Sequence, residues 1–440
     1  MNVPTLSSLD YQPYEELYVS LHSNPGLSLQ ESFASSIALS HLESLNRSLP
    51  SSAEFTIHKS IGGYGLAAVL KNREGPTTLL RADMDALPVL EQTNLPYASN
   101  KTEVDKTDGK EKPVMHACGH DMHVTALLAA ADILSHSIDH WSGTLILIFQ
   151  PAEEKGTGAK SMVDDDLYSK IPIPDIVLGQ HVFPTRAGNV GLRSGTIMAA
   201  ADSIRITLYG RGAHGSMPQQ SVDPVLLASY IVVRLQGVVS REVDPAEAAV
   251  VTVGSIIAGE AENVIPETAL MKINIRSQTP STRARVLNAV KRIINAEAAA
   301  SGCPKEPLIE TIVSFPLSIN DPSSTSTLVK PFSAHFGNKF DASCTISNAS
   351  EDFSVLATSV SKPSIFWLFG GMDEEKYDKA EKEGRMYEDI PANHSAYFAP
   401  VIQPTLKTGT EALVLGALTF LGKGKEKGGE GRRESVKGVE

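Results

Sequence analysis

The sequence predicts an α/β fold with helices on both faces of its main sheet and a smaller inserted domain. Short apolar runs, at residues 144–149 and 176–179, alternate with helical segments, as in strands that are covered on both faces. Between residues 197 and 315 the order becomes β-α-β-β-α-β, which is typical of a ferredoxin-like domain. With 440 residues, 42% of them hydrophobic, the chain is long enough to bury more than one core.

The first part of the catalytic domain is expected at residues 1–196. A helical pair should be broken at Pro25 and Gly26, and a buried strand should begin near residue 77. A helix is predicted at 123–137, because Leu127, Leu128, Ala131 and Leu134 share one face at helical spacing. Two further buried strands are predicted in the apolar runs within 143–154 and 174–184, the second of them over "IVLG" at 176–179.

The inserted domain is expected at residues 197–315. Its predicted strands cover 202–210, 248–259, 267–277 and 307–316, and its helices follow Asp223 and run from 281 to Gly302. The catalytic domain should resume at 316–422 and end with a helix at 405–421. The stretch 423–440 is rich in Gly and Lys, and we expect a disordered tail there.

Composition excludes several classes of protein. The formal net charge of -12 argues against a nucleic-acid partner. The sequence has no apolar run long enough for a membrane span and no secretory signal pattern, so we expect a cytoplasmic protein that does not bind membranes. Three scattered cysteines do not suggest a disulfide framework.

Polar side chains with metal-binding chemistry follow predicted strands. Asp83 and Asp85 follow the first of these strands, Glu153 and Glu154 follow the second, and His181 follows the third. Open α/β sheets build their sites at this edge. The aspartates could instead cap the next segment, and the glutamate pair could be a solvated helix start. The apolar strand before Pro151 favours a buried strand end for the pair.

The segment "MHACGHDMH" at 115–123 raises the question of what its thiol does. Cys118 and His120 stand two residues apart in a predicted extended segment, so both can reach one metal before the helix begins. Thiolate, imidazole and carboxylate together indicate a transition-metal site. The remaining histidines of the N-terminal third are interpreted as structural or surface residues (His22, His41, His58, His136 and His140) or as packing and supporting residues (His116 and His123).

Eight ordered motifs between residues 14 and 422 carry a family resemblance. They are "LLRADMDALPV", "MHACGHDMH", "LIFQPAEE", "GQHV", "GRGAHGSMPQQSVDP", "NVIP", "SEDFS" and "NHSAYF". The chain resembles the aminoacylase and carboxypeptidase metallopeptidase family, in particular its amidohydrolase branch, which includes hippurate hydrolases and plant enzymes that cleave auxin-amino acid conjugates. The resemblance implies a zinc-peptidase-like mixed sheet and an insert that acts as a lid and dimerisation domain.

The resemblance also implies roles for individual residues. Two divalent ions, zinc or manganese with cobalt or nickel as further options, would be held by Cys118, His120, Glu154, His181 and His394, and the cysteine sulfur would bridge them. Glu153 would be the general base, and Asp85 would lie behind the site. In the insert, His214 would stabilise the oxyanion and move in on closure, while Asn263 and Arg276 would hold the substrate carboxylate.

Three functions remain open at this point. The first is hydrolysis of N-acyl or N-aroyl amino acids, hippurate-like or auxin-conjugate-like. The second is a dipeptidase or carboxypeptidase with the same centre, and the third is a non-catalytic metal-binding interaction protein. The stretches "KGTGAKSM" and "HSAYF" depart from the family pattern, which affects the expected substrate choice. The insert suggests a homodimer formed through an exposed sheet edge.

Overall fold

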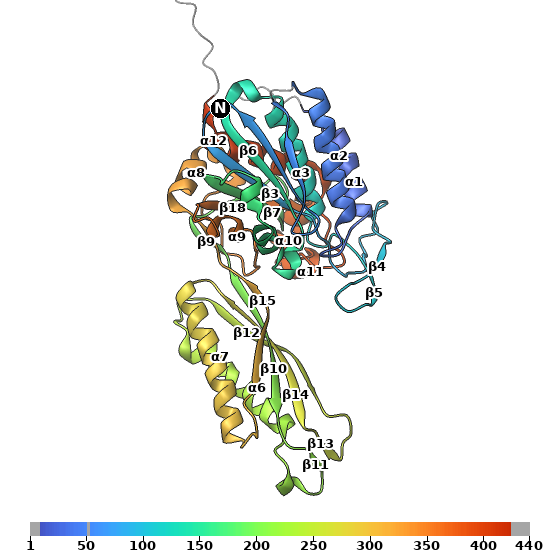
Figure 1. Ribbon diagram of the computed structural model, residues 1–440, viewed down its shortest axis with the longest axis vertical. Helices are drawn as coiled ribbons and strands as arrows, with labels where there is room; N and C mark the ends of the chain where they lie inside the picture. The colour runs from blue at the N-terminus through green and yellow to red at the C-terminus, as the bar shows by residue number, and fades with distance from the viewer. Residues whose placement is uncertain (1–8, 51–52, 424–440) are drawn as a thin grey trace, which may run out of the picture.

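The computed structural model describes residues 9–50 and 53–423, which form a large α/β part and an elongated second part (Figure 1). Apart from Lys423, the predicted tail lies outside the described residues. No helix within the described ranges combines the length and the apolar character that a membrane span requires.

The large part is built on a mixed sheet, which has nine strands within the described residues. In sheet order they are β1 (Thr56–Ile61), β2 (Gly65–Asn72), β6 (Trp141–Gln150), β3 (Thr77–Asp83), β7 (Ile176–Arg186), β18 (Ser364–Met372), β8 (Val190–Gly191) and β17 (Phe340–Asp341), with β19 (Gly422–Lys423) beside β6. The central strands β6, β3, β7 and β18 are parallel, and β1 and β2 add an antiparallel edge. The carboxyl ends of the parallel strands therefore share one edge.

Helices cover both faces of this sheet, as the sequence predicted. One core contains α1 (Gln12–Ser23), α2 (Ser32–Ser48), α3 (His120–Ser135), α8 (Pro322–Phe336) and α12 (Ile402–Phe420). The opposite core contains α4 (Gly158–Asp164), α5 (Leu167–Lys170) and α9 (Ser354–Thr358). Helix α3 is buried on nearly every side, which its almost uninterrupted apolar sequence allows.

The second part is a four-stranded antiparallel sheet with two helices. Its strands lie in the order β12 (Ala249–Ala258), β14 (Thr268–Ser277), β10 (Ala200–Tyr209) and β15 (Leu308–Phe315). Helices α6 (Pro224–Glu242) and α7 (Pro280–Ala300) pack against this sheet, and the hydrophobic core of the second part lies between them and the strands. The order along the chain is β-α-β-β-α-β, so the predicted ferredoxin-like fold is confirmed.

Local signals in the sequence explain the helix boundaries in this second part. The Asp223 side chain accepts hydrogen bonds from the amides of Val225 and Leu226, with a proline at the first helical position of α6. Thr279 caps α7 in the same way, and Gly302 adopts a left-handed conformation just beyond its end. These signals determine where α6 and α7 begin and where α7 ends.

Smaller elements complete the fold. They are β4 (Thr102–Val104) with β5 (Glu111–Pro113), β9 (Gly195–Met198) with β16 (Ser318–Asn320), β11 (Ala213–His214) with β13 (Val264–Ile265), helices α10 (Glu374–Glu383) and α11 (Met386–Asp389), and 3-10 turns η2 (Ile138–His140), η3 (Glu153–Lys155), η4 (Pro218–Gln220) and η5 (Gly337–Lys339). The β9–β16 pair lies where the chain enters and leaves the second part (Figure 1).

Candidate metal centre

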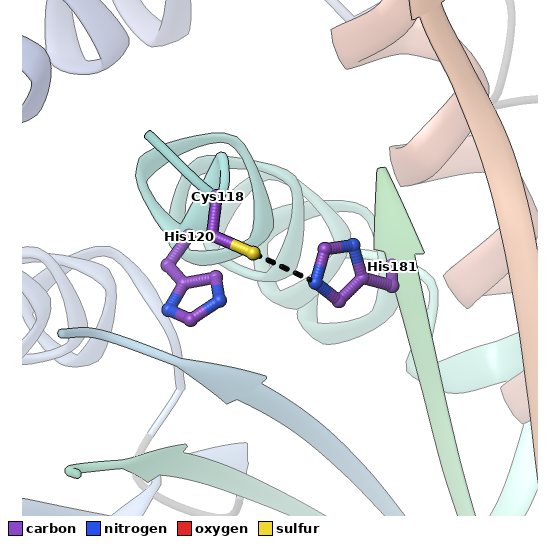
Figure 2. Close-up of side chains that lie close together, drawn as sticks. All are labelled: Cys118, His120 and His181. Atoms are coloured by element: carbon purple, nitrogen blue, oxygen red, sulfur yellow. Dashed lines mark hydrogen bonds between the residues drawn. The ribbon is translucent and has the colours of Figure 1, made fainter. Parts of the chain in front are cut away.

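Five side chains from distant parts of the chain converge at one edge of the large sheet: Cys118, His120, Glu154, His181 and His394. The Cys118 sulfur lies 3.4 Å from Nε2 of His181, and the His120 ring lies beside it (Figure 2). Oε1 of Glu154 lies 3.4 Å from Nε2 of His394 and 3.9 Å from Nε2 of His120. Ligand atoms of Cys118, His120 and His181 are within 4.8 Å of one another, and so are those of Cys118, Glu154 and His394. The sulfur is thus common to two groups of three.

Several of these atoms lack hydrogen-bond partners. Both ring nitrogens of His120 and Oε1 of Glu154 are buried and form no hydrogen bond within the described part of the chain, although they lie 3.4 to 3.9 Å from ionisable groups. A buried polar atom without a partner costs about 1 to 3 kcal/mol. Sulfur, imidazole and carboxylate donors together suit zinc and other transition metals. The residues present therefore fit a pair of divalent cations.

The segment that carries Cys118 and His120 differs from the prediction. His120 is the first residue of α3 rather than part of an extended segment, so the expectation of two extended residues before the helix was wrong. Gly119 at the helix start has φ 83°, and a Cβ there would lie 2.4 Å from Cγ1 of Val182. The tight turn at Gly119 brings both donors to one place without an extended backbone.

His181 also lies in a different setting from the one expected. Strand β7 continues to Arg186 because β18 pairs with it along its length, so His181 lies within the strand and not after it. Its Nδ1 donates a hydrogen bond of 2.7 Å to the carbonyl of Val182, if that nitrogen carries the proton. Nε2 then faces the Cys118 sulfur with its lone pair.

Glu153 and Glu154 form the 3-10 turn η3, with Glu153 buried and Glu154 half-buried. The expected burial is observed for Glu153, and the pair follows the end of β6 at Gln150 after two residues, in a 3-10 turn. The Asp85 carboxylate holds the turn, because it accepts the backbone amides of Glu153 at 3.1 Å and Glu154 at 3.0 Å. The same carboxylate accepts the Ser28 hydroxyl at 2.6 Å and lies 3.4 Å from Nδ1 of His120. Asp85 therefore connects the turn to His120.

A buried ionic network that the sequence reasoning missed lies beneath Glu153. The Arg81 guanidinium donates to Asp83 at 2.7 Å and to Glu351 at 2.8 Å, and it lies 3.3 Å from Asp352. Carboxylate oxygens of Glu153, Glu351 and Asp352 lie within 4.8 Å of one another. The signal in the sequence was an arginine inside an otherwise apolar strand, since a buried arginine requires acidic partners.

Both carboxylate oxygens of Asp83 have partners in this network. Its second oxygen lies 2.5 Å from Nδ1 of His123, and Nε2 of that histidine accepts the Val182 amide at 2.8 Å. His123 therefore packs behind the cluster as a supporting residue. Asn393, which was not singled out, lies 3.9 Å from the Cys118 sulfur through its side-chain amide.

The cluster opens into a cavity of about 500 Å³ between the two parts of the protein. Its lining residues are Cys118, Glu153, Glu154, His181, Phe183, Pro184, Met198, Ala201, Ser203, Asn274, Arg276, Val313, Phe315, Ala349, Ser350, Ala392, Asn393 and His394. Arg276 is half-buried, and burial lowers the pKa of its guanidinium. It donates to the Asn274 side chain at 3.2 Å and the Asn348 carbonyl at 2.5 Å, and it has no ion-pair partner among the described residues.

The other two predicted residues of the insert lie elsewhere. Strand β10 leaves the cavity near Ala201 and runs for ten residues, about 30 Å at the usual rise per residue. His214 lies in β11 and Asn263 directly before β13, at the far end of the second part (Figure 1). Both are exposed, and neither lines the cavity. Their roles in catalysis and substrate binding stay predictions.

The sequence is similar to those of several metal-dependent peptidases and amide hydrolases. Residues 79–401 match peptidase family M20/M25/M40. The hippurate hydrolase of Campylobacter jejuni is 36% identical over 352 residues, 78% of this chain and 85% of that protein. The thermostable carboxypeptidase 2 of Saccharolobus solfataricus is 32% identical, over 92% of this chain and 94% of the relative. An IAA-amino acid hydrolase of Arabidopsis thaliana is 34% identical, over 80% and 76%.

Solved structures agree with the sequence relatives. A protein from methicillin resistant Staphylococcus aureus superposes with a TM-score of 0.79 at 28% identity, covering 95% of this chain and 98% of that one. A dinuclear metal-binding peptidase of the M20 family from Bacillus subtilis superposes with a TM-score of 0.71 at 25% identity, covering 93% and 98%. Because both its sequence and its structure are similar to those of family members, the chain belongs to peptidase family M20/M25/M40, and within it to the amidohydrolase branch.

Proposed function

We propose that this member of an amide-hydrolase family is a metal-dependent amidohydrolase that cleaves N-acyl or N-aroyl amino acids. One observation carries the proposal: Cys118, Glu154, His181 and His394 line the same cavity as the buried Glu153 and the Arg276 guanidinium, which has no ion-pair partner among the described residues. His120 completes the cluster of donors. The donors suit divalent cations, the carboxylate suits proton transfer, and the guanidinium suits a substrate carboxylate.

Cys118, His120, Glu154, His181 and His394 would hold two divalent ions, with the Cys118 sulfur shared between them. When bound, such ions polarise a carbonyl oxygen and lower the pKa of water. Zinc or manganese is proposed as the native metal, with cobalt or nickel as substitutes, because affinity and availability both decide occupancy.

Glu153 is the proposed general base. Burial raises the pKa of its carboxyl group well above the usual range, and the nearby carboxylates of Glu351, Glu154 and Asp352 raise it further. A carboxylate with a raised pKa accepts a proton from attacking water and can then deliver it to the leaving nitrogen. Its backbone is held by Asp85, so the proton acceptor keeps a fixed position beside Glu154.

Charge in the cavity supports an N-acylated substrate. Arg276 can form paired hydrogen bonds with a terminal carboxylate, and Asn274 and Asn348 hold its guanidinium in place. Among the described residues that line the cavity, the only carboxylates are Glu153 and Glu154, and both have other roles. A free α-ammonium group would therefore find no acidic partner of its own.

The alternative function, a dipeptidase or carboxypeptidase, is favoured by one observation. The relative that covers most of this chain among the three compared is a carboxypeptidase. A peptide substrate also presents a terminal carboxylate to Arg276, so the site chemistry alone supports either substrate class.

The test is a substrate panel on the purified full-length protein. Metal content is measured first, and each of zinc, manganese, cobalt and nickel is restored after chelation. Hydrolysis is then compared for N-benzoyl-alanine, N-acetyl-alanine, alanyl-alanine and the carboxamide of N-benzoyl-alanine. We expect metal-dependent cleavage of N-benzoyl-alanine and N-acetyl-alanine. Cleavage of alanyl-alanine and of the carboxamide should be at least about tenfold weaker than that of N-benzoyl-alanine. Faster cleavage of the free dipeptide would support the alternative.

We further propose that the protein acts as a homodimer through the second part. Strand β12 is an edge strand of its sheet, and Val250, Ile256 and Ile257 on it are at least 41% exposed. His214 and Asn263 would take part in catalysis only if movement of the second part, or association with a second subunit, brought them to the cavity that holds the metal ligands. Light scattering of the native protein and of an Ile257→Lys variant measures the oligomeric state directly.

A further inference from the structure

Three neighbouring strands of the second part, β14, β10 and β15, border the cavity with one face of their sheet. Arg276 of β14 lies directly opposite Ala201 of β10, and Ala201 lies directly opposite Phe315 of β15. Residues directly opposite one another point to the same face of a sheet. All three line the cavity, so this row of side chains faces the metal cluster.

A second row runs parallel to the first. Asn274 of β14, Ser203 of β10 and Val313 of β15 are opposite one another in the same register, and all three line the cavity. Asp202, between the two rows, points the other way and bonds to Arg283 of α7. We refer to Ala201, Ser203, Asn274, Arg276, Val313 and Phe315 as the platform.

The platform changes chemistry from strand to strand. Its β14 column is cationic and polar, its β10 column has only small side chains, and its β15 column is apolar. Adjacent strands lie about 4.8 Å apart, so the Arg276 and Phe315 backbones are about 10 Å apart across the sheet. A hydrogen bond of 3.0 Å from the Asn274 amide to the Ser203 hydroxyl fixes the polar side.

Phe315 is also fixed from the catalytic side. Its ring lies against Gly156, where an added Cβ would be 3.0 Å from the ring carbon Cζ. Gly156 has φ 62° and closes the η3 turn that carries Glu153 and Glu154. The apolar end of the platform is therefore next to the proposed catalytic turn.

We propose that Phe315 and Val313 form the subsite for the acyl group, and that the platform selects substrates with an aromatic or bulky apolar acyl group over N-acetyl substrates. The inference rests on the proposed function and adds its substrate class. In an N-acyl amino acid the scissile amide lies between the carboxylate and the acyl group. A substrate anchored at Arg276 and extended toward β15 puts this amide over the small side chains of β10, which line the same cavity as Cys118 and Glu153.

The experiment varies the two halves of the substrate separately. One series keeps glycine and changes the acyl group from acetyl to phenylacetyl to benzoyl. The other keeps benzoyl and changes the amino acid from glycine to alanine to leucine. For each, kcat/KM is measured with the metal-loaded full-length protein and with Phe315→Ala, Phe315→Leu and Val313→Ala.

The native protein is expected to prefer benzoylglycine over acetylglycine by about tenfold or more, since one methylene in an apolar pocket already contributes about 10- to 200-fold and an aromatic ring buries more apolar area. Phe315→Ala should reduce that preference by about tenfold, mainly through KM, with Phe315→Leu intermediate. The ratios within the second series should stay within about twofold. Ile312→Ala is the matched control, because this residue lies on the same strand, is 48% exposed and does not line the cavity.

Two failures can be told apart. If the native protein cleaves none of these amides, the proposed function itself falls. If it cleaves them but Phe315→Ala leaves the acyl preference unchanged, or shifts the amino-acid series instead, the proposed function stands and the acyl subsite is overturned. The far-UV circular dichroism spectrum and the urea unfolding midpoint of each variant, compared with those of the native protein, show whether the variant is folded.

Discussion

Nδ1 of His22 lies 2.7 Å from an oxygen of Asp121, the residue that follows His120 in the chain. Nε2 of the same ring lies 3.0 Å from Glu91, and all three side chains are fully buried at this contact. His22 belongs to α1, so the contact connects that helix to the start of α3, which carries His120 of the candidate metal-binding cluster.

This contact predicts a pH dependence of stability. Burial lowers the pKa of His22, but the hydrogen bonds and charges of Asp121 and Glu91 outweigh it and raise the pKa to about 9. A folded pKa above the unfolded one gives stability that is complete below about pH 6.5 and is lost as the pH rises to about 9, roughly 3 kcal/mol in all. Urea unfolding in the presence of a chelator should show this loss in the native protein. It should be absent in His22→Gln, and equal slopes in both would contradict the assignment.

Asp85→Asn should weaken metal binding. The asparagine keeps the shape of the side chain but carries no charge beside His120. One of the two oxygens becomes an amide nitrogen, which cannot accept a hydrogen bond, so one of the two η3 amides loses its acceptor. Loss of such a supporting partner typically costs 10- to 100-fold in metal affinity. Competitive titration with a chelator measures it. Ser28→Ala, which removes one hydrogen bond to the same carboxylate, is the control and should change affinity much less.

Glu153→Gln should retain its metals and lose activity by about 10² to 10⁴-fold, the usual contribution of general acid-base catalysis. The amide is similar in size but cannot accept the proton. Metal analysis and kcat measured on the same preparation separate the two effects. If the variant loses its metals, the roles given to Glu153 and Glu154 are exchanged.

Cys118→Ser should behave in the opposite way and release metal readily. The sulfur belongs to both groups of three donors, and a serine hydroxyl is a much weaker ligand for soft transition metals. The loss of affinity should exceed the 10- to 100-fold expected of a supporting residue. Metal binding as tight as that of the native protein would remove the thiol from the ligand set.

Arg81→Met should destabilise the fold strongly. It leaves Asp83, Glu351 and Asp352 buried without their cation, and breaking a buried ionic network of this kind costs about 3 to 5 kcal/mol. Arg205→Met is the matched control, because its ion pair with Glu310 lies at the surface and should contribute no more than about 1 kcal/mol. Chemical unfolding of both variants provides the comparison, and equal losses would rule out the network as the cause.

Much of the fold could be predicted because its signals are local. The helix caps at Asp223 and Thr279 and the alternating pattern of the insert strands specify each element from a few adjacent residues. The chemistry of the cluster was also visible, since sulfur, imidazole and carboxylate groups follow or interrupt apolar strands. Residue types thus indicated a metal site before any distance was known.

Features that depend on contacts between distant segments could not be predicted. The acidic partners of Arg81 at Glu351 and Asp352 come about 270 positions later in the sequence. The length of β7 depends on its pairing with β18, which is why His181 was expected at a strand end. The register that places Arg276, Ala201 and Phe315 in one row follows from strand pairing, and nothing in the three residues themselves reveals it.

The pairing of Ala201 with Phe315 has an evolutionary consequence. The segment from β10 to β15 starts and finishes on neighbouring strands, so the surrounding chain needs to span only one interstrand gap where it interrupts. A gene fragment for such a self-closing unit can be gained, exchanged or lost without moving the ends of the host sheet. Each exchange would bring new side chains to the cavity, while the candidate metal-binding residues of the large part would stay the same.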